Sequence, residues 1–259
     1  MTLLQRPGTY ISYNVSGDGN PLLLTHGFAA TSNMFSGNLP ELTQHNQVIT
    51  WDIRGHGASD YPEVASQYTI SASVGDMVAL LDVLGIERAT IGGHSIGGYL
   101  SLAFAIEHPD RLNALVLIDS GPGFRRPSAR DAWNQVAEGY AVNLEAHGLD
   151  GMAKGREQQL ASHRDATGLV RAARGILKRH DSSVREGLSS ISVPTLVIVG
   201  GDDTSFLKGA YFMTQEIPDA RLAVIAGAGH APNVSHPEEF NAQLSAFLDN
   251  VSSQAGTRQ

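Results

Sequence analysis

The 259-residue chain contains no cysteine, only two tryptophans and no long apolar run. Without cysteine it has no disulfide framework, no cysteine-ligated zinc and no thiol nucleophile. No apolar run approaches the ~20 residues that a membrane-spanning helix needs, so we expect no membrane partner and a cytoplasmic location.

Basic side chains are also scarce, because 18 lysines and arginines face 26 acidic residues, which gives a formal net charge of −8. Phosphate backbones repel such a chain, so we expect no nucleic-acid partner. The charge is unevenly spread: residues 122–190 carry 11 basic and 8 acidic side chains, whereas the rest of the chain carries 7 and 18. The acidic character therefore belongs to the chain outside 122–190.

Short apolar runs recur along the sequence with helical patterns between them. Several runs are almost wholly apolar, which is typical of strands covered on both faces. The first run alternates and ends at a Gly-rich turn, which predicts an edge hairpin strand. The alternation of strand and helix predicts an α/β fold with a mostly parallel sheet flanked by helices. The predicted strands are Tyr10–Val15, Leu22–Thr25, Gln47–Trp51, Ala89–Gly92, Ala114–Ile118, Thr195–Val199 and Arg221–Ile225.

One interval breaks this rhythm, because no convincing strand appears between Ile118 and Thr195. Apolar residues at helical spacing appear there instead. We therefore expect two parts: a core formed by residues 1–121 and 191–259, and an inserted helical cap formed by residues 122–190 that lies over the sheet edge.

A serine follows the predicted strand Ala89–Gly92 directly, within the G-x-S-x-G sequence Gly93–Gly97, and a helical pattern begins just after it. A strand-to-helix turn this sharp exposes the serine hydroxyl in a strained conformation. The dipole of the following helix favours negative charge at the same point. This context predicts that Ser95 is a nucleophile.

A serine nucleophile needs a base, and His230 is the best placed of the ten histidines. It lies in a Gly-rich loop after the last predicted strand. The carboxyl ends of parallel strands meet at one edge of the sheet, so this loop and the Ser95 turn should meet. His236 is the rival, but it precedes Pro237 and is typical of a helix entry.

The base in turn needs an acid that fixes its tautomer. Asp203 follows the strand Thr195–Val199 at the same expected edge, and we take it as that acid. Asp202 and Asp119 are the alternatives. The order serine, aspartate, histidine is that of the α/β-hydrolase layout.

Two main-chain amides should stabilise a developing oxyanion. The first is Ile96, directly after the serine. The second lies in the loop after Leu22–Thr25, where we expect Phe28 to donate, with Ala29 as the alternative. Gly27 lets the backbone approach closely.

Over essentially its whole length the chain resembles the α/β-hydrolase superfamily. Ordered motifs at suitable spacing make this resemblance specific for the superfamily, and much less specific for a substrate. The Asp52–Asp60 stretch implies a structural loop near the site. The matching segments are His26–Phe28, Asp52–Asp60, Gly93–Gly98, Gly200–Asp203 and Gly229–His230.

The resemblance implies a serine hydrolase of the carboxylesterase or enol-lactonase type, acting on a small ester. A lactonase or a carbon–carbon bond hydrolase is the alternative, and a perhydrolase or a ligand sensor is less favoured. Ser95 argues against the dehalogenases and epoxide hydrolases of this fold, which use aspartate. His94 and Ala231 depart from the asparagine and tryptophan frequent in carbon–carbon hydrolases. The sequence after Asp203 lacks the family's frequent proline, so this loop is expected to differ in shape.

Aromatic residues near the oxyanion loop and in the cap are candidates for the substrate pocket, although each could serve ordinary packing instead. They are Phe35, Phe124, Trp133 and Tyr140. No metal-binding motif or dinucleotide fingerprint is present, so we expect no metal and no cofactor. The oligomeric state stays open.

The surplus of basic residues in the cap has two interpretations. The first is that these side chains pair with cap carboxylates or cover helix faces. The second is that one of them reaches the pocket and favours a substrate that bears a carboxylate. The basic residues concerned are Arg125, Arg126, Arg130, Arg171, Arg174, Lys178 and Arg179.

Overall fold

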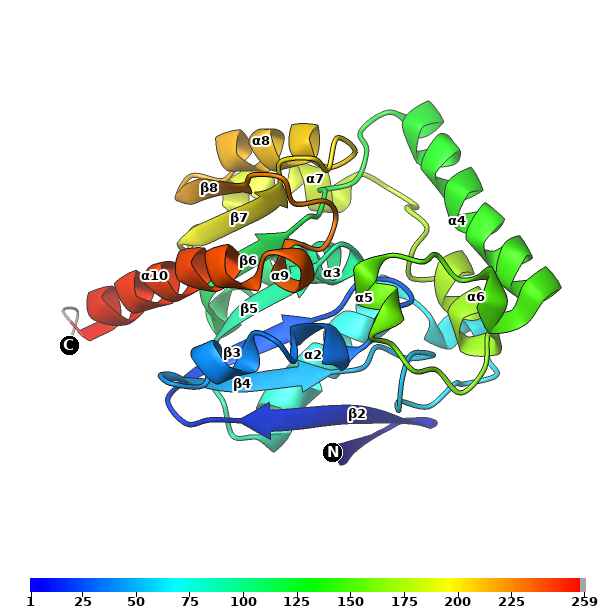
Figure 1. Ribbon diagram of the computed structural model, residues 1–259, viewed down its shortest axis with the longest axis horizontal. Coiled ribbons are helices and arrows are strands. Elements are labelled where there is room, and N and C mark those ends of the chain that lie inside the picture. Colours follow the sequence, from blue (N-terminus) through cyan, green and yellow to red (C-terminus); the bar gives the residue numbers. More distant parts are fainter. Residues whose placement is uncertain (257–259) are drawn as a thin grey trace.

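An eight-stranded sheet forms the centre of the molecule in the computed structural model, which describes residues 1–256 (Figure 1). Its strand order is β1-β2-β4-β3-β5-β6-β7-β8. The β1–β2 and β2–β4 pairs are antiparallel and all the others are parallel, so the predicted α/β fold is confirmed. The strands are β1 (Thr2–Arg6), β2 (Thr9–Ser16), β3 (Asn20–Thr25), β4 (Asn46–Trp51), β5 (Ala89–His94), β6 (Leu112–Ile118), β7 (Thr195–Gly200) and β8 (Ala220–Ile225).

The apolar strands are buried on both faces, as their composition predicts. In β6, Leu115 and Leu117 point to one side of the sheet, whereas Val116 and Ile118 point to the other. Successive side chains alternate between faces, so a continuous apolar run contributes to two separate cores. The sheet therefore needs a helical layer on each side.

Helices supply these two layers. One core contains apolar residues of α2, α3 and α8, and the other contains those of α1 and α10. Thr69 caps α2 by accepting a hydrogen bond from the Ala72 amide.

 At the other end of α2, Gly85 has a φ of 67°, a left-handed conformation that ends the helix. The helices of the two layers are α1 (Leu39–Leu42), α2 (Ile70–Val83), α3 (Ile96–Glu107), α8 (Leu207–Glu216), α9 (Pro232–Ser235) and α10 (Pro237–Gly256).

The N-terminal edge of the sheet differs from the prediction. Tyr10–Val15 lies in β2, which pairs with β1 on one side and with β4 on the other, so it is not the edge strand. The Gly-rich turn after β2 also does not form a hairpin with β3, because β4 lies between β2 and β3. The edge is β1, whose exposed side chains carry little sequence signal.

The segment between β6 and β7 is helical, and the described part of it contains no strand. Figure 1 shows α4, α5 and α6 grouped beside the central sheet. This segment, residues 122–190, is called the inserted segment below. Its helices are α4 (Pro127–His147), α5 (Arg156–Gln159), α6 (Thr167–Arg174) and α7 (Ser183–Glu186).

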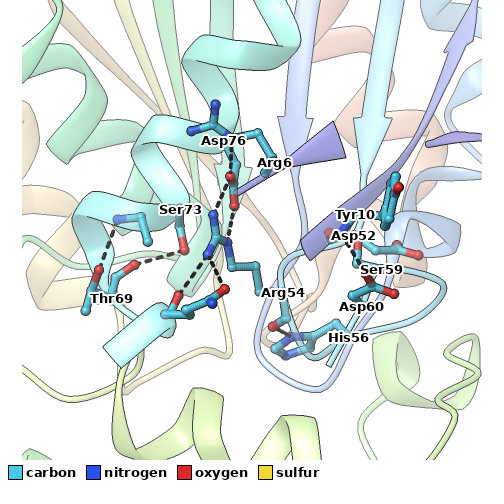
Figure 2. Close-up of polar contacts among 12 residues, drawn as sticks. Arg6, Tyr10, Asp52, Arg54, His56, Ser59, Asp60, Thr69, Ser73 and Asp76 are labelled. Atoms are coloured by element: carbon cyan, nitrogen blue, oxygen red, sulfur yellow. Dashed lines mark hydrogen bonds and ion pairs between the residues drawn. The ribbon is translucent and has the colours of Figure 1, made fainter. Parts of the chain in front are cut away.

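The Asp52–Asp60 loop is held by buried polar contacts (Figure 2). Arg54 donates to both carboxylate oxygens of Asp76, at 2.6 and 2.8 Å, and Arg6 donates to the same carboxylate at 2.9 Å. The Asp52 carboxylate accepts hydrogen bonds from the Ser32 and Ala58 amides. These contacts give Asp52 and Arg54 a structural role, in line with the expectation from the sequence. Among residues 1–256 no helix is long and apolar enough to cross a membrane.

Candidate active site

Ser95 occupies the sharp turn between β5 and α3. Its φ of 53° and ψ of −113° lie in a region that non-glycine residues rarely adopt. Its amide donates to the Ile118 carbonyl at 2.8 Å, and its own carbonyl accepts from the Ser120 hydroxyl at 2.7 Å. Contacts with the end of β6 therefore hold the strained backbone in place.

Residues with strained backbone conformations lie close to one another at this edge of the sheet. Within the described chain, the non-glycine residues with positive φ are Ala29, Ser95 and Asp119. They follow β3, β5 and β6, three neighbouring strands. Such conformations persist only where the surroundings enforce them, and they concentrate at functional sites. Each of the three loops therefore contains one residue whose backbone is strained.

Glycine is required where these loops touch. A side chain at Gly97 would collide with the Thr25 carbonyl, and one at Gly27 would lie 2.5 Å from the His94 ring. The absence of these side chains therefore lets the turn after β5 approach the loop after β3 closely.

His230, in the loop after β8, contacts Asp203, in the loop after β7. Its Nδ1 lies 2.6 Å from Asp203 Oδ2, and its ring stacks on Phe206 with ring centroids 4.7 Å apart. Because the carboxylate accepts, Nδ1 carries the proton and Nε2 is left free in the neutral ring. Asp202 is exposed, and among the described residues neither it nor Asp119 forms a hydrogen bond with the His230 side chain.

The two buried carboxyl groups at this edge titrate in opposite directions. Burial raises the pKa of Asp119 to about 9, although the Gly200 amide donates to its Oδ1 at 3.0 Å. Burial also disfavours the Asp203 anion, but the hydrogen bond from His230 and its other donors hold the Asp203 pKa below its usual value. At neutral pH Asp119 is therefore a neutral acid and Asp203 an anion.

His94 has a role that the sequence did not reveal. Its Nε2 lies 2.6 Å from the main-chain carbonyl of His230, and its ring packs against the His230 ring with centroids 4.7 Å apart. A carbonyl only accepts, so Nε2 donates and Nδ1 is unprotonated. Burial lowers the pKa of His94 to about 3, in agreement with a neutral ring. His94 thus fixes the backbone of the loop that carries His230.

The loop after β3 is held from the inserted segment. Gln158 donates to the Phe28 carbonyl at 3.2 Å, and His163 Nε2 lies 3.0 Å from the Ala29 carbonyl. The main-chain amides of Phe28 and Ile96 have no hydrogen-bond acceptor within residues 1–256. Both amides are therefore available to a ligand at the site.

Two cavities open beside Ser95. One, of about 520 Å³, is lined by Phe28, Tyr140, His230 and Ser95 itself. The other, of about 400 Å³, is lined by Ser95, Ile96, Phe124 and Arg179. Trp133, Leu177, Ser205 and Phe206 line both cavities, as Ser95 does, so the two cavities adjoin beside the serine.

Three of the four aromatic pocket candidates, Phe124, Trp133 and Tyr140, line these cavities. Phe35 does not: it is fully buried and packs with Met34 and Leu42 in the core on the α10 side of the sheet. The expectation for Phe35 therefore fails, because its short helical turn directs the ring to the core. Nothing in the sequence indicates that direction.

One group of side chains within the described residues has the composition of a metal site. The nearest ligand atoms of Asp119, Asp203 and His230 lie within 4.8 Å of one another. Two ligands of one tetrahedral ion, each at about 2.1 Å, would lie about 3.4 Å apart. His230 and Asp203 are 2.6 Å apart, so these two atoms share a proton rather than an ion.

The chain belongs to the α/β-hydrolase fold family, whose model matches residues 20–162. It is 29% identical to 3-oxoadipate enol-lactonase 1 of Acinetobacter baylyi, over 96% of this chain and 97% of the relative. It is 27% identical to a putative carbamate hydrolase, RutD, of Pseudomonas savastanoi pv. phaseolicola, over 90% and 95%. The structure of a thermophilic esterase from Thermogutta terrifontis superposes with a TM-score of 0.79 at 30% identity, covering 96% and 97%. The chain is thus a hydrolase, and its relatives act on more than one type of bond.

Proposed function

We propose that this protein is a serine hydrolase that cleaves a small carboxylic ester through an acyl-enzyme, with Ser95 as nucleophile, His230 as base and Asp203 as the acid that orients it. One observation carries the proposal. His230 is hydrogen-bonded to Asp203 at 2.6 Å and lines the same cavity as Ser95, which is held in a strained turn. A base held in one tautomer, in a cavity that a serine also lines, is the arrangement that acyl transfer needs.

The reaction begins when His230 Nε2 takes the proton of the Ser95 hydroxyl as the oxygen attacks the ester carbonyl. Asp203 stabilises the imidazolium that forms. The Phe28 and Ile96 amides donate to the oxyanion of the tetrahedral intermediate. His230 then protonates the departing alkoxide, and the acyl-enzyme remains on Ser95.

Deacylation repeats these steps with water as nucleophile. His230 takes a proton from the water, the carboxylic acid leaves, and Ser95 regains its proton. The α3 N-terminus lies directly behind Ser95, so its dipole also favours the oxyanion in both halves of the reaction.

In this proposal the inserted segment acts as a cap. Phe124, Trp133 and Tyr140 supply apolar walls on either side of Ser95, which fits a small substrate with an apolar part. Gln158 and His163 link the cap to the loop that bears the Phe28 amide. The substrate is a small molecule, and a cytoplasmic location stays a prediction from the sequence.

A lactone is the second candidate substrate. The support is the 29% identity, over 96% of the chain, to an enol-lactonase. A lactone is a cyclic ester, so the same residues would open it and the alkoxide would stay attached to the acyl-enzyme until water releases it.

Labelling with a fluorophosphonate tests the mechanism. We expect covalent labelling of the wild-type protein at a single peptide that contains Ser95, and no labelling of Ser95→Ala. Ser101, whose buried hydroxyl donates to the Gly97 carbonyl, is the matched control, and Ser101→Ala should label normally. Labelling that persists in Ser95→Ala would overturn the proposal.

A panel of substrates then separates the two bond types. Matched aryl esters, γ- and δ-lactones and vinylogous diketones should be compared by kcat/KM. The proposal expects the esters to lead. Leading activity on lactones would favour the second candidate, whereas leading activity on the diketones would contradict both.

A further inference from the structure

We propose that Arg179 is an anion-binding residue beside Ser95, and that the preferred ester carries a carboxylate which this guanidinium binds. The inference rests on the proposed function, because it concerns the substrate of the same site. For Arg179 it favours the second interpretation of the basic residues in 122–190, in which one of them reaches the pocket.

Three of the basic residues in the cap have hydrogen-bond or ion-pair partners away from the two cavities. Arg174 pairs with Glu138 and Glu145, and Lys178 pairs with Glu138, all at the surface of the inserted segment. Arg171 donates to the Pro62 carbonyl. Arg174 and Lys178 agree with the first interpretation, in which cap cations pair with cap carboxylates.

Arg179 differs from them in burial and in pairing. Its exposed fraction is 6%, yet it forms no ion pair with any carboxylate in residues 1–256. Arg54, equally buried at 5%, has the Asp76 carboxylate at 2.6 Å. Buried charges are almost always paired, so a buried guanidinium without an anion indicates a missing partner.

The hydrogen bonds of Arg179 leave donors unused. Its Nη1 donates to the main-chain carbonyls of Ile176, Leu177 and Lys178. Its Nε and Nη2 have no acceptor within the described residues. A guanidinium presents two parallel N–H bonds that match a carboxylate, and the Nε–Nη2 edge is one such pair.

The position of this guanidinium is fixed by aromatic rings. Its central carbon lies 3.6 Å above the Tyr99 ring and 6.0 Å from the Trp133 ring. Burial lowers the pKa of Arg179 to about 10, which still leaves the group charged at neutral pH. Gly123, at a φ of 81°, passes so close that a side chain there would touch Tyr99. The cation is therefore held rigidly at the wall of the 400 Å³ cavity that Ser95 also lines.

The two cavities beside Ser95 differ in charge. The one with Arg179 is also lined by Arg185 and Lys208, and no carboxylate belongs to its lining. The larger one is lined by Glu157 and Asp203 and by no lysine or arginine. The Asp203 anion would repel a second carboxylate in the larger cavity. An anionic substrate group is thus directed to the Arg179 side of the serine.

Two pairs of esters test the proposal. Mono-(4-nitrophenyl) adipate and its methyl ester differ in one charge on the acyl side. 3-Acetoxybenzoate and its methyl ester differ in one charge on the alcohol side. Rates are corrected for spontaneous hydrolysis, and the readout is the ratio of kcat/KM for the anionic ester to that for the neutral ester. We expect the wild-type ratio to exceed 1 clearly in at least one pair.

Arg179→Met should lower that ratio by about 10- to 100-fold, since a hydrogen-bonded charge contact is lost. Arg179→Lys should lower it by a smaller factor, because lysine keeps the charge but not the fork. Arg174→Met, a surface cap arginine outside both cavities, is the matched control and should leave the ratio unchanged. A purely structural role for Arg179 would reduce both esters equally and leave the ratio constant.

The outcomes separate this inference from the proposed function. A wild-type ratio of 1 or below in both pairs overturns the inference, and so does a high ratio that survives in both Arg179 variants. Should Arg179→Met fail to fold, the Lys variant and the wild-type ratio decide alone. Failure to hydrolyse even the neutral esters, together with no labelling of Ser95, would instead overturn the proposed function.

Discussion

Asp119 and Asp203 stand at the ends of the neighbouring strands β6 and β7, but only Asp203 accepts a hydrogen bond from His230. Their carboxyl groups lie within 4.8 Å of each other. Two buried carboxyl groups this close resist ionising together, so one holds its proton. Here Asp119 is the neutral member, and the negative charge is concentrated on the group that faces the histidine.

The first prediction concerns this division of roles. Asp203→Asn should lower kcat about 10³- to 10⁴-fold, because an amide no longer fixes the productive tautomer of His230. Asp202→Asn is the matched control: its exposed carboxylate adjoins Asp203 but does not contact His230, so kcat should stay near wild type. Steady-state kinetics on one aryl ester measures both. Equal losses in the two variants would contradict the assignment.

The second prediction is that Asp119→Asn stabilises the protein at neutral and alkaline pH. The unfolded Asp119 ionises above about pH 3.8, whereas the folded group stays neutral to about pH 9. Stability is therefore lost as the pH rises between these values, by up to about 1.4 kcal/mol for each pH unit. Asparagine has no such loss, and its amide can still accept from the Gly200 amide.

Urea unfolding at pH 5 and pH 8 measures this difference. The gain of Asp119→Asn over wild type should be larger at pH 8, and kcat at pH 7 should stay within about threefold, since the neutral acid is replaced by a neutral amide. A variant that is less stable than wild type at pH 8 would show that Asp119 is ionised in the folded state.

Much of this edge of the sheet could be predicted from the sequence. Ser95, Asp203 and His230 each follow an apolar strand, and the rule that parallel strands end at one edge is enough to bring them together. The structure places all three there. The strand β1 could not be found in the same way, because none of its side chains is buried and it pairs with β2 along its whole length.

Side-chain direction is what the sequence could not supply. Phe35 is one of several aromatic residues near the oxyanion loop, and only the packing of its turn shows that it joins the core. The contact between His94 and the His230 carbonyl spans 136 positions and has no local signal. The burial of Arg179 could not be predicted from the sequence either, because it depends on Tyr99, which belongs to a helix far away in the sequence.

The third prediction addresses His94. His94→Ala should lower kcat about 10-fold with little change in KM, because the His230 loop loses a hydrogen bond that positions the base. His94→Gln, which keeps a side-chain N–H donor, should recover part of that loss. Kinetics on one ester, with fluorophosphonate labelling to count intact sites, measures both. Full activity in the Ala variant would show that the contact is dispensable.

The fourth prediction is a loss of stability in mild acid. Burial lowers the pKa of His26 to about 4 and that of His94 to about 3, and it also lowers the pKa of His56 and of His163. Hydrogen bonds require neutral rings: His26 Nε2 accepts from the Ile53 amide, and His163 Nδ1 accepts from the Gly57 amide. Below about pH 6.5 these four histidines bind protons in the unfolded chain, whereas in the folded protein they stay neutral to lower pH.

Because the folded pKa values are depressed, the stability is complete above about pH 6.5 and is lost as the pH falls from there towards 4. Each histidine contributes up to about 1.4 kcal/mol for each pH unit in this window. Urea unfolding at pH 7.5, 6.5, 5.5 and 4.5 should show this decline. His163→Gln should reduce the slope of the unfolding free energy against pH by the contribution of one histidine. His45→Gln, the control at an exposed position, should leave this slope unchanged. A stability that is constant from pH 6.5 to pH 4.5 would mean that these rings accept protons within the folded protein.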